Sequence, residues 1–195
     1  MFKQVSDRLA QAATLKSLAA VGAMFVIFSF IFTYADVPFG LARLERISGG
    51  LRILDLQPYY TPEMAYRFLD AYQEEGRRVY LSILTADLFY PLAYSSFLAL
   101  SISWVFRRAF KPENPAQFLN LLPFVAALLD YAENVGVYTL LRHYPERLSD
   151  VAQRTAYFSA AKLMLSNVCV LALAIGVIFY LARRAGLPRP HQTST

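Results

Sequence analysis

The sequence predicts an all-α integral membrane protein, a four-transmembrane-helix bundle with a short amphipathic interfacial helix between the first and second spans. Hydrophobic residues make up 56% of the 195-residue chain, and its mean hydropathy is +0.36. A soluble domain of this size needs a more polar surface. The apolar residues gather in four runs, each near the roughly 20 residues that cross a hydrocarbon core. The predicted spans cover about residues 18–35, 79–106, 118–141 and 156–182.

The first run could also belong to a secretion signal. Lys3, Arg8 and Lys16 precede it, and it ends in Thr33-Tyr34-Ala35, a pattern that a signal peptidase can accept. However, the run is long for the apolar part of a signal peptide, and the later spans need a partner for their polar faces. We therefore interpret it as a retained first span.

The connection at residues 36–78 is the only segment long enough to form structure outside the spans. Thr61, Pro62 and Glu63 give a helix start, and Gly76 gives a stop. Apolar residues recur between them at helical spacing, which predicts an amphipathic helix that acts as a lid over a cavity or as a simple connector. These residues are Ala65, Phe68, Leu69 and Tyr72. Residues 51–56 predict a second short interfacial turn, after the Gly49-Gly50 break.

Basic residues predict the orientation of the spans. The arginine pairs at 107–108 and 183–184 directly abut span ends, so the positive-inside rule places both termini in the cytoplasm, although the pair at 77–78 favours the opposite orientation. We expect an integral protein of a bacterial inner membrane. The proline-containing tail at residues 186–195 is predicted to be disordered.

Several classes of function are not supported by any motif. The net charge is +5, but the basic residues lie at helix ends instead of on a nucleic-acid-binding surface. Cys169 is the only cysteine, and the sequence contains no glycine-rich phosphate loop and no His-x-x-x-His spacing. We predict no cofactor. Three carboxylates could hold a hard cation, but Lys162 competes for them, so we predict no metal either.

Four ionisable side chains lie inside the predicted spans: Asp87, Asp130, Glu133 and Lys162. Each costs roughly 2.5 to 3.5 kcal/mol to insert, and such groups usually face a bundle interior, form pairs or line a polar cavity. Three acids and one base leave an excess of negative charge. Either one or two carboxyls are protonated, or a cation, an amine ligand or water enters. We expect Lys162 to pair with Glu133 or Asp87, and Asp130 to be protonated.

Counting residues predicts that these groups meet. Asp87, Glu133 and Lys162 each lie about seven or eight residues from the outer end of a span, or roughly 12 Å at 1.5 Å per residue. Asp130, Glu133 and Asn134 stand at i, i+3 and i+4 and share one helix face. Asp130 lies about one turn deeper, where polar side chains of two other spans can approach it. These are Asn167 on the fourth span and Tyr90 or Tyr94 on the second.

Two resemblances follow from these motifs. Residues 76–80, 87–91 and 130–134 together resemble small four-span bacterial membrane proteins of uncharacterised activity. More weakly, Asp55-Leu56-Gln57 and the second span around Asp87 resemble the EXPERA family of sterol isomerases and sigma-type receptors. That resemblance implies that Asp55 and Asp87 hold a cationic amine or stabilise positive charge in a sterol-like substrate.

The leading hypothesis is an acidic pocket within the membrane that binds an amphiphilic or cationic small molecule or a lipid, with acid/base chemistry as an extension. In it, Asp87 and Glu133 act as acid and base and Lys162 tunes them, while Asp130, Asn134 and the neighbouring polar residues position the ligand. The first alternative is proton- or cation-coupled transport by a homo-oligomer. The second is a structural or assembly subunit bound to another membrane protein. Whether the protein is an enzyme stays open.

Overall fold

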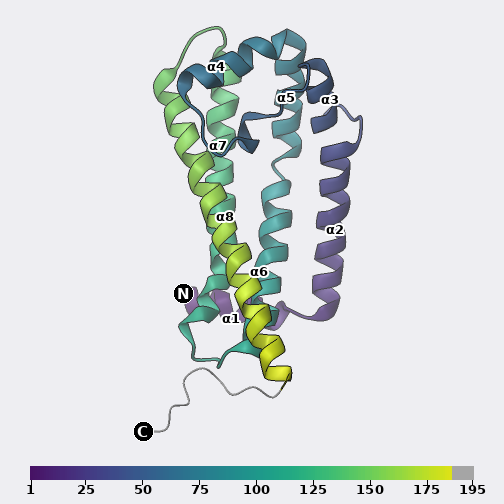
Figure 1. Ribbon diagram of the computed structural model, residues 1–195, viewed down its shortest axis with the longest axis vertical. Coiled ribbons are helices and arrows are strands. Elements are labelled where there is room, and N and C mark those ends of the chain that lie inside the picture. The colour runs from purple at the N-terminus through teal and green to yellow at the C-terminus, as the bar shows by residue number, and fades with distance from the viewer. Residues whose placement is uncertain (186–195) are drawn as a thin grey trace.

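A computed structural model describes residues 1–185, and within that range the regular elements are all helical (Figure 1). Four helical segments are long and apolar enough to cross a membrane: Leu15–Tyr34, Gln73–Ala109, Pro115–His143 and Ser149–Arg184. The predicted all-α bundle with four spans is therefore confirmed, and the four segments indicate a membrane protein. The tail expected at residues 186–195 lies outside the described residues.

Helix α1 (Phe2–Ala12) precedes the first span and was not predicted. It packs at the base of the bundle, where Arg107 donates a hydrogen bond of 2.6 Å to the Ala10 carbonyl and the Asn120 amide donates one of 3.1 Å to the Ser6 carbonyl. A capping box at Thr14 and Ser17 then starts α2 (Leu15–Tyr34). These contacts fix the first span to the same end of the bundle as the arginine pairs.

The second span is two helices, α5 (Gln73–Ala86) and α6 (Tyr90–Ala109), joined by a turn at residues 87–89 (Figure 1). The break has a local cause. Pro91 has no N–H to donate to the carbonyl four residues earlier, that of Asp87, and its ring would clash with that carbonyl. The Asp87 N–H still bonds to the Ile83 carbonyl, at 2.8 Å, so Asp87 closes α5. The single helix expected across residues 79–106 is thus divided beside its acidic residue.

The connection between the first two spans folds into α3 (Leu41–Ile47), the 3₁₀ helix η1 (Leu54–Leu56) and α4 (Pro62–Ala71). Thr61 caps α4 as predicted, with its hydroxyl accepting from the Met64 N–H at 3.3 Å. The predicted stop at Gly76 is wrong, because α4 ends at Ala71 and Gly76 lies inside α5. The chain turns at Gln73, whose φ is +55°.

These elements form a cap with an apolar core of its own, made together with the upper parts of α5, α7 (Leu122–His143) and α8 (Ser149–Arg184). Its most deeply buried members come from all of these elements. They include Leu44, Leu54, Tyr60, Leu69, Tyr72, Ile83, Val137 and Leu140. The predicted connector is therefore a folded part of the protein, packed on one end of the bundle.

Within the bundle, α6 and α7 are central, whereas α2 and most of α8 expose their apolar side chains. The third span begins with the 3₁₀ helix η2 (Pro115–Leu121) before α7. Helices α7 and α8 approach closely at Gly136, where a Cβ would lie 2.0 Å from the Thr155 hydroxyl oxygen. This contact sets the register in which α7 and α8 present their polar residues to each other.

Candidate functional site

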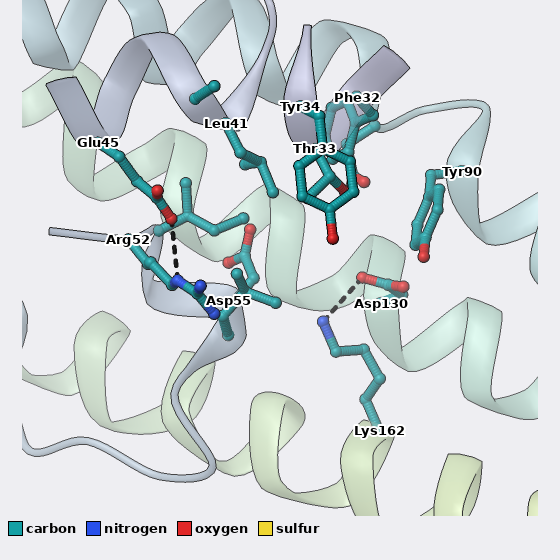
Figure 2. Close-up of a pocket in the computed structure, with 14 residues that line it drawn as sticks. Phe32, Thr33, Tyr34, Leu41, Glu45, Arg52, Asp55, Tyr90, Asp130 and Lys162 are labelled. Carbon is teal, nitrogen blue, oxygen red and sulfur yellow. Dashed lines mark hydrogen bonds and ion pairs between the residues drawn. The ribbon is translucent and has the colours of Figure 1, made fainter. Parts of the chain in front are cut away.

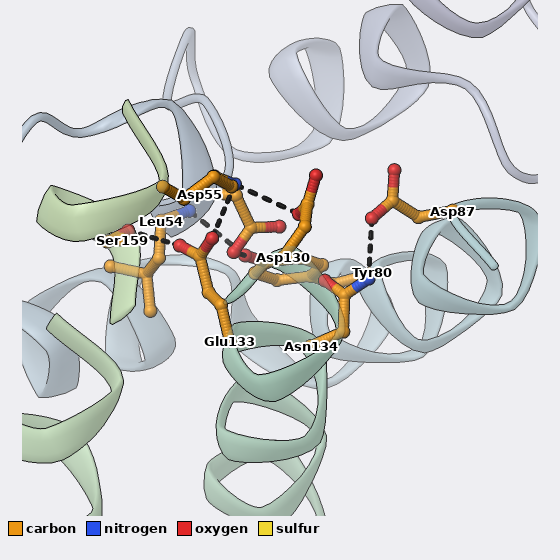
Figure 3. Close-up of polar contacts among 9 residues, drawn as sticks. Leu54, Asp55, Tyr80, Asp87, Asp130, Glu133, Asn134 and Ser159 are labelled. Carbon is orange, nitrogen blue, oxygen red and sulfur yellow. Dashed lines mark hydrogen bonds and ion pairs between the residues drawn. The ribbon is translucent and has the colours of Figure 1, made fainter. Parts of the chain in front are cut away.

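Lys162 on α8 lies between two carboxylates of α7. Its Nζ atom is 3.0 Å from Asp130 Oδ1 and also contacts Glu133 Oε2, while the Ser159 hydroxyl, one turn earlier on α8, donates to Glu133 Oε1 (Figure 3). The expected pair of Lys162 with Glu133 is present, and Asp130 shares the same ammonium. We call Asp130, Glu133, Ser159 and Lys162 the ion cluster. It is buried and joins the two helices directly.

Asp87 stands apart from the ion cluster. It lies at the turn between α5 and α6 and is only 7% exposed. Its Oδ2 atom accepts a hydrogen bond of 2.6 Å from the Asn134 amide of α7 (Figure 3). Within the described residues, no cation lies close enough to Asp87 to form an ion pair. Asp87 is thus a buried carboxyl whose hydrogen-bonding partner is neutral.

Asp55 reaches the same region from the cap. The segment around η1 descends between the helices of the bundle (Figure 1), which buries Asp55 and differs from the interfacial turn expected at residues 51–56. The Tyr80 hydroxyl donates to Asp55 Oδ1 at 3.2 Å and accepts from the Leu54 N–H at 3.0 Å. Burial raises the pKa of the Asp55 carboxyl, and the nearby Lys162 ammonium opposes that shift.

A cavity of about 400 Å³ reaches these groups (Figure 2). Every span and the cap contribute to its wall. The wall includes an ion pair of Arg52 and Glu45, whose atoms are 2.9 Å apart, and several buried acidic residues. The lining consists of Phe32, Thr33, Tyr34, Leu41, Ala42, Glu45, Arg52, Ile53, Leu56 and Tyr90, together with Asp55, Asp87, Asp130 and Lys162. The cavity is therefore apolar along much of its wall and charged where it meets α7 and α8.

The remaining residues predicted for the site differ in position. Tyr90 lines the cavity and stacks on Phe32, with ring centroids 5.7 Å apart. Neither Tyr94 nor Glu133 lines the cavity: Tyr94 is half-buried, and Glu133 is fully buried. Asn167 is exposed on α8, away from the cavity. The structure therefore does not bring Asn167 into the site.

Four polar residues at the site were not predicted. Ser159 could have been found, because it stands three residues before Lys162 and so shares its helix face. Tyr80 gives no separate signal, because aromatic residues near span ends are typical of membrane interfaces. Glu45 and Arg52 gave no signal, since their meeting depends on how the cap folds over the bundle.

The charges around the cavity do not balance. Five carboxyls belong to the lining and the ion cluster, against two cations: Glu45, Asp55, Asp87, Asp130 and Glu133 face Arg52 and Lys162. Arg52 forms an ion pair with Glu45, and Lys162 forms ion pairs with both Asp130 and Glu133. Asp55 and Asp87 are left with neutral donors only. Uncompensated carboxylates in a poorly hydrated site are costly, so this arrangement favours a proton or a cationic ligand.

The cavity lies where the helices of the bundle meet the cap. Helices α2 and α6 have 20 residues each, which matches a core of roughly 30 Å, and at their cap ends lie Tyr34 and Tyr90, both on the cavity wall. The 36 residues of α8 extend roughly 54 Å, so its cap end must project beyond that core. The acidic groups thus lie at the junction of bundle and cap.

Among residues 1–185, no three histidine, cysteine, aspartate or glutamate side chains are arranged to hold a metal ion. Compared with models of protein families, with curated proteins and with solved structures, the chain matches none of them. The fold and the site define its class on their own. It is a membrane protein with a four-span helical bundle, a folded helical cap and an acidic cavity between them.

Proposed function

We propose that this protein binds an amphiphilic molecule with a cationic head group, and that the head group enters the cavity to contact Asp87. The observation that carries this proposal is the state of that residue. Asp87 is buried, lines the cavity and accepts only a neutral amide hydrogen bond, whereas the nearest cation is engaged by Asp130 and Glu133. A cationic head group would supply the missing charge.

The size and position of the cavity suit such a ligand. Its volume of about 400 Å³ lies within the usual range for small-molecule sites, roughly 300 to 1,000 Å³. Phe32, Leu41 and Leu56 offer apolar contacts beside the acids. A cavity at the junction of bundle and cap also matches the depth at which an amphiphile places its head group. The weak resemblance to EXPERA proteins, which singles out Asp55 and Asp87, supports the same ligand class.

The ion cluster has a different role in this proposal. Lys162 and Glu133 contact each other directly, and Glu133 is closed off from the cavity, so neither is free to exchange a proton with a ligand. We assign them to holding α7 against α8 and to positioning Asp130. Any acid/base chemistry on a bound molecule falls to Asp87 and Asp55, the two carboxyls that line the cavity and have no ion-pair partner among the described residues.

The main alternative is that all of these polar groups serve only to hold the helices together. The closed contacts of the ion cluster favour it for Lys162 and Glu133, but they do not involve Asp87. The two functions differ in what Asp87→Asn does. A ligand site loses binding and keeps its fold, whereas a purely structural network shows no binding to lose.

The test is binding of dodecylamine, a single-chain amine that is protonated at pH 7, to the protein in nanodiscs, with partition into empty nanodiscs subtracted. Losing one charge-assisted contact of about 1.5–3 kcal/mol should weaken binding to Asp87→Asn by roughly 10- to 100-fold. Asp150→Asn, an exposed residue at the start of α8, is the matched control and should bind like the original protein. Absence of saturable binding, or equal affinity in Asp87→Asn, would contradict the proposal.

We further propose that the protein lies in a bacterial inner membrane with both termini cytoplasmic. The arginine pairs at 107–108 and 183–184 lie at one end of the bundle, where Arg183 donates to the Arg108 carbonyl, and the positive-inside rule assigns that end to the cytoplasm. In a Cys169→Ser background, an impermeant maleimide applied to intact cells should label Gly49→Cys in the cap and not Gln11→Cys. The reverse pattern would overturn the orientation.

A further inference from the structure

A second pocket lies at the end of the bundle opposite the cap, where the turn between α1 and α2 meets the end of α6 (Figure 1). It is an open groove with a volume of about 770 Å³. Three of the residues that line it are cationic, Lys16, Arg107 and Arg108, and every other lining residue is uncharged. We call it the basal groove. Its charge is opposite to that of the acidic cavity beneath the cap.

The cations of the basal groove are accessible and have no anionic partner. Within residues 1–185, none of the three forms an ion pair, and all three are exposed. Arg107 donates to the Ala10 carbonyl at 2.6 Å, and Arg108 donates to the Trp104 carbonyl at 2.8 Å and lies over the Trp104 ring. A guanidinium has several N–H donors, so each arginine is held in place with donors to spare.

Neighbouring elements add to the positive charge. Helix α2 begins in the groove, since Leu15 and Lys16 both line it, and the start of a 20-residue helix carries the positive end of its dipole. Arg183 of α8 donates to the Arg108 carbonyl and so brings a further cation to this end of the bundle. Helices α2, α6 and α8 therefore combine their charges at one place, which favours an anionic ligand.

The surroundings of the groove indicate where that anion comes from. Helix α2 begins at the groove and α6 ends at it, and each has 20 residues, about the number that crosses a hydrocarbon core. The ends of such spans lie at the level of phospholipid head groups. Leu15, in the groove, is 67% exposed, and α2 exposes its apolar side chains along most of its length. Acyl chains can lie along this surface while a head group occupies the groove.

We infer that the basal groove binds the phosphate of an anionic phospholipid, with the head group among Lys16, Arg107 and Arg108 and the acyl chains along α2. A head group with a net negative charge is preferred, because the groove has no carboxylate to receive the cationic part of a zwitterionic lipid. This site lies at the other end of the bundle from Asp87 and does not depend on the ligand proposed there.

The experiment uses native mass spectrometry of the full-length protein, released from detergent micelles, to measure binding of the first lipid molecule. Dioleoyl-phosphatidylglycerol should bind at least about 10-fold more tightly than dioleoyl-phosphatidylcholine, whose head group is zwitterionic, or dioleoylglycerol, which has no phosphate. Each cation near an anionic lipid contributes a factor of about five. Equal binding of the three lipids would overturn the inference. Displacement of the lipid by inorganic phosphate at equal concentration would show that the groove takes a free anion, and would overturn the assignment to a lipid.

A double variant locates the binding. Lys16→Gln with Arg108→Gln removes two cations while Arg107 stays in place, and it should weaken binding of phosphatidylglycerol by about 10-fold or more. The matched control is Arg67→Gln with Arg142→Gln, which removes two exposed cations at the cap end and should change binding little. An equal loss in both variants would show attraction by overall charge and overturn the site. If the double variant does not fold, Lys16→Gln alone should weaken binding about five-fold, and unchanged binding in that variant would contradict the inference.

Discussion

The Asn134 amide donates a hydrogen bond of 2.6 Å to the Asp87 carboxylate across 47 residues of sequence, and it ties the turn between α5 and α6 to the middle of α7. The turn exists because Pro91 interrupts the helix at the carbonyl of Asp87. An acidic side chain therefore ends a helix beside a cavity, where the Asn134 amide holds one of its oxygens.

The Lys162 ammonium should be a major source of stability. Replacing it by methionine leaves Asp130 and Glu133 as neighbouring buried carboxyls without a cation, and breaking a buried pair in this way costs about 3–5 kcal/mol. We expect Lys162→Met to lower the apparent free energy of unfolding by that amount, measured by denaturant titration in detergent micelles. Lys16→Met, at an exposed lysine, should change it little. Adding Glu133→Gln to Lys162→Met should recover part of the loss, and no recovery would contradict the assigned pairing.

The close contact of α7 with α8 predicts that Gly136 tolerates no side chain. A Cβ there would lie 2.0 Å from the Thr155 hydroxyl oxygen and 2.8 Å from its methyl carbon. Gly136→Ala should destabilise the protein by about 1–3 kcal/mol, as overpacking usually does. Thermal unfolding of Gly136→Ala with and without Thr155→Ala checks this, because the second change removes both of those atoms. If the double variant is no more stable than the single one, the clash is not the cause.

Tyr80 should hold the η1 segment in place. Its hydroxyl bonds to Asp55 and to the Leu54 N–H, and Tyr80→Phe removes both contacts while leaving buried groups unpaired. We expect a loss of about 1–3 kcal/mol in stability and faster amide hydrogen exchange in residues 53–57. Tyr138→Phe, at an exposed tyrosine, is the matched control. Unchanged exchange in Tyr80→Phe would show that the segment is held by packing alone.

The buried Asp55 carboxyl predicts a pH dependence with a defined sign. Burial raises its pKa above the ordinary value of 3.8, so the folded protein binds this proton more tightly than the unfolded chain does. The stabilisation that this proton gives the folded state is fully present below the unfolded pKa of 3.8. It is lost as the pH rises through the higher pKa of the folded state. Asp55→Asn should therefore flatten the fall in the unfolding temperature above pH 4.

Asp36 provides a comparison of opposite sign. The hydrogen bond from Arg46 lowers the pKa of the exposed Asp36 carboxyl, so its contribution is present above the unfolded value and is lost as the pH falls. Asp36→Asn should change the plot of unfolding temperature against pH only at acidic pH. The change should be small because the ion pair with Arg46 is exposed. Identical profiles for Asp55→Asn and the original protein between pH 4 and 9 would contradict the assignment for Asp55.

The sequence predicted the parts of this fold that depend on local chemistry. Four apolar runs gave the spans because transfer out of water acts on each segment separately. The spacing of Asp130, Glu133 and Asn134 placed them on one face of α7 because helix geometry is fixed, and Thr61 marked the start of α4 because its hydroxyl caps the first turn. Pro91 also carries a local signal for the break, because it removes a helical hydrogen bond, but the apolar run around it predicts a continuous span.

Tertiary packing decided which of these groups meet. Lys162 contacts Asp130 and Glu133 because α7 and α8 pack closely with these faces turned toward each other. Asp87 bonds to Asn134 because the break in the second span brings Asp87 next to α7. Asp55 lies in the site because residues 41–72 fold into a cap, and the apolar core of this cap buries η1. Periodicity along one segment determines which face of a helix is polar. It does not determine the partner of that face, which depends on contacts between segments far apart in the chain.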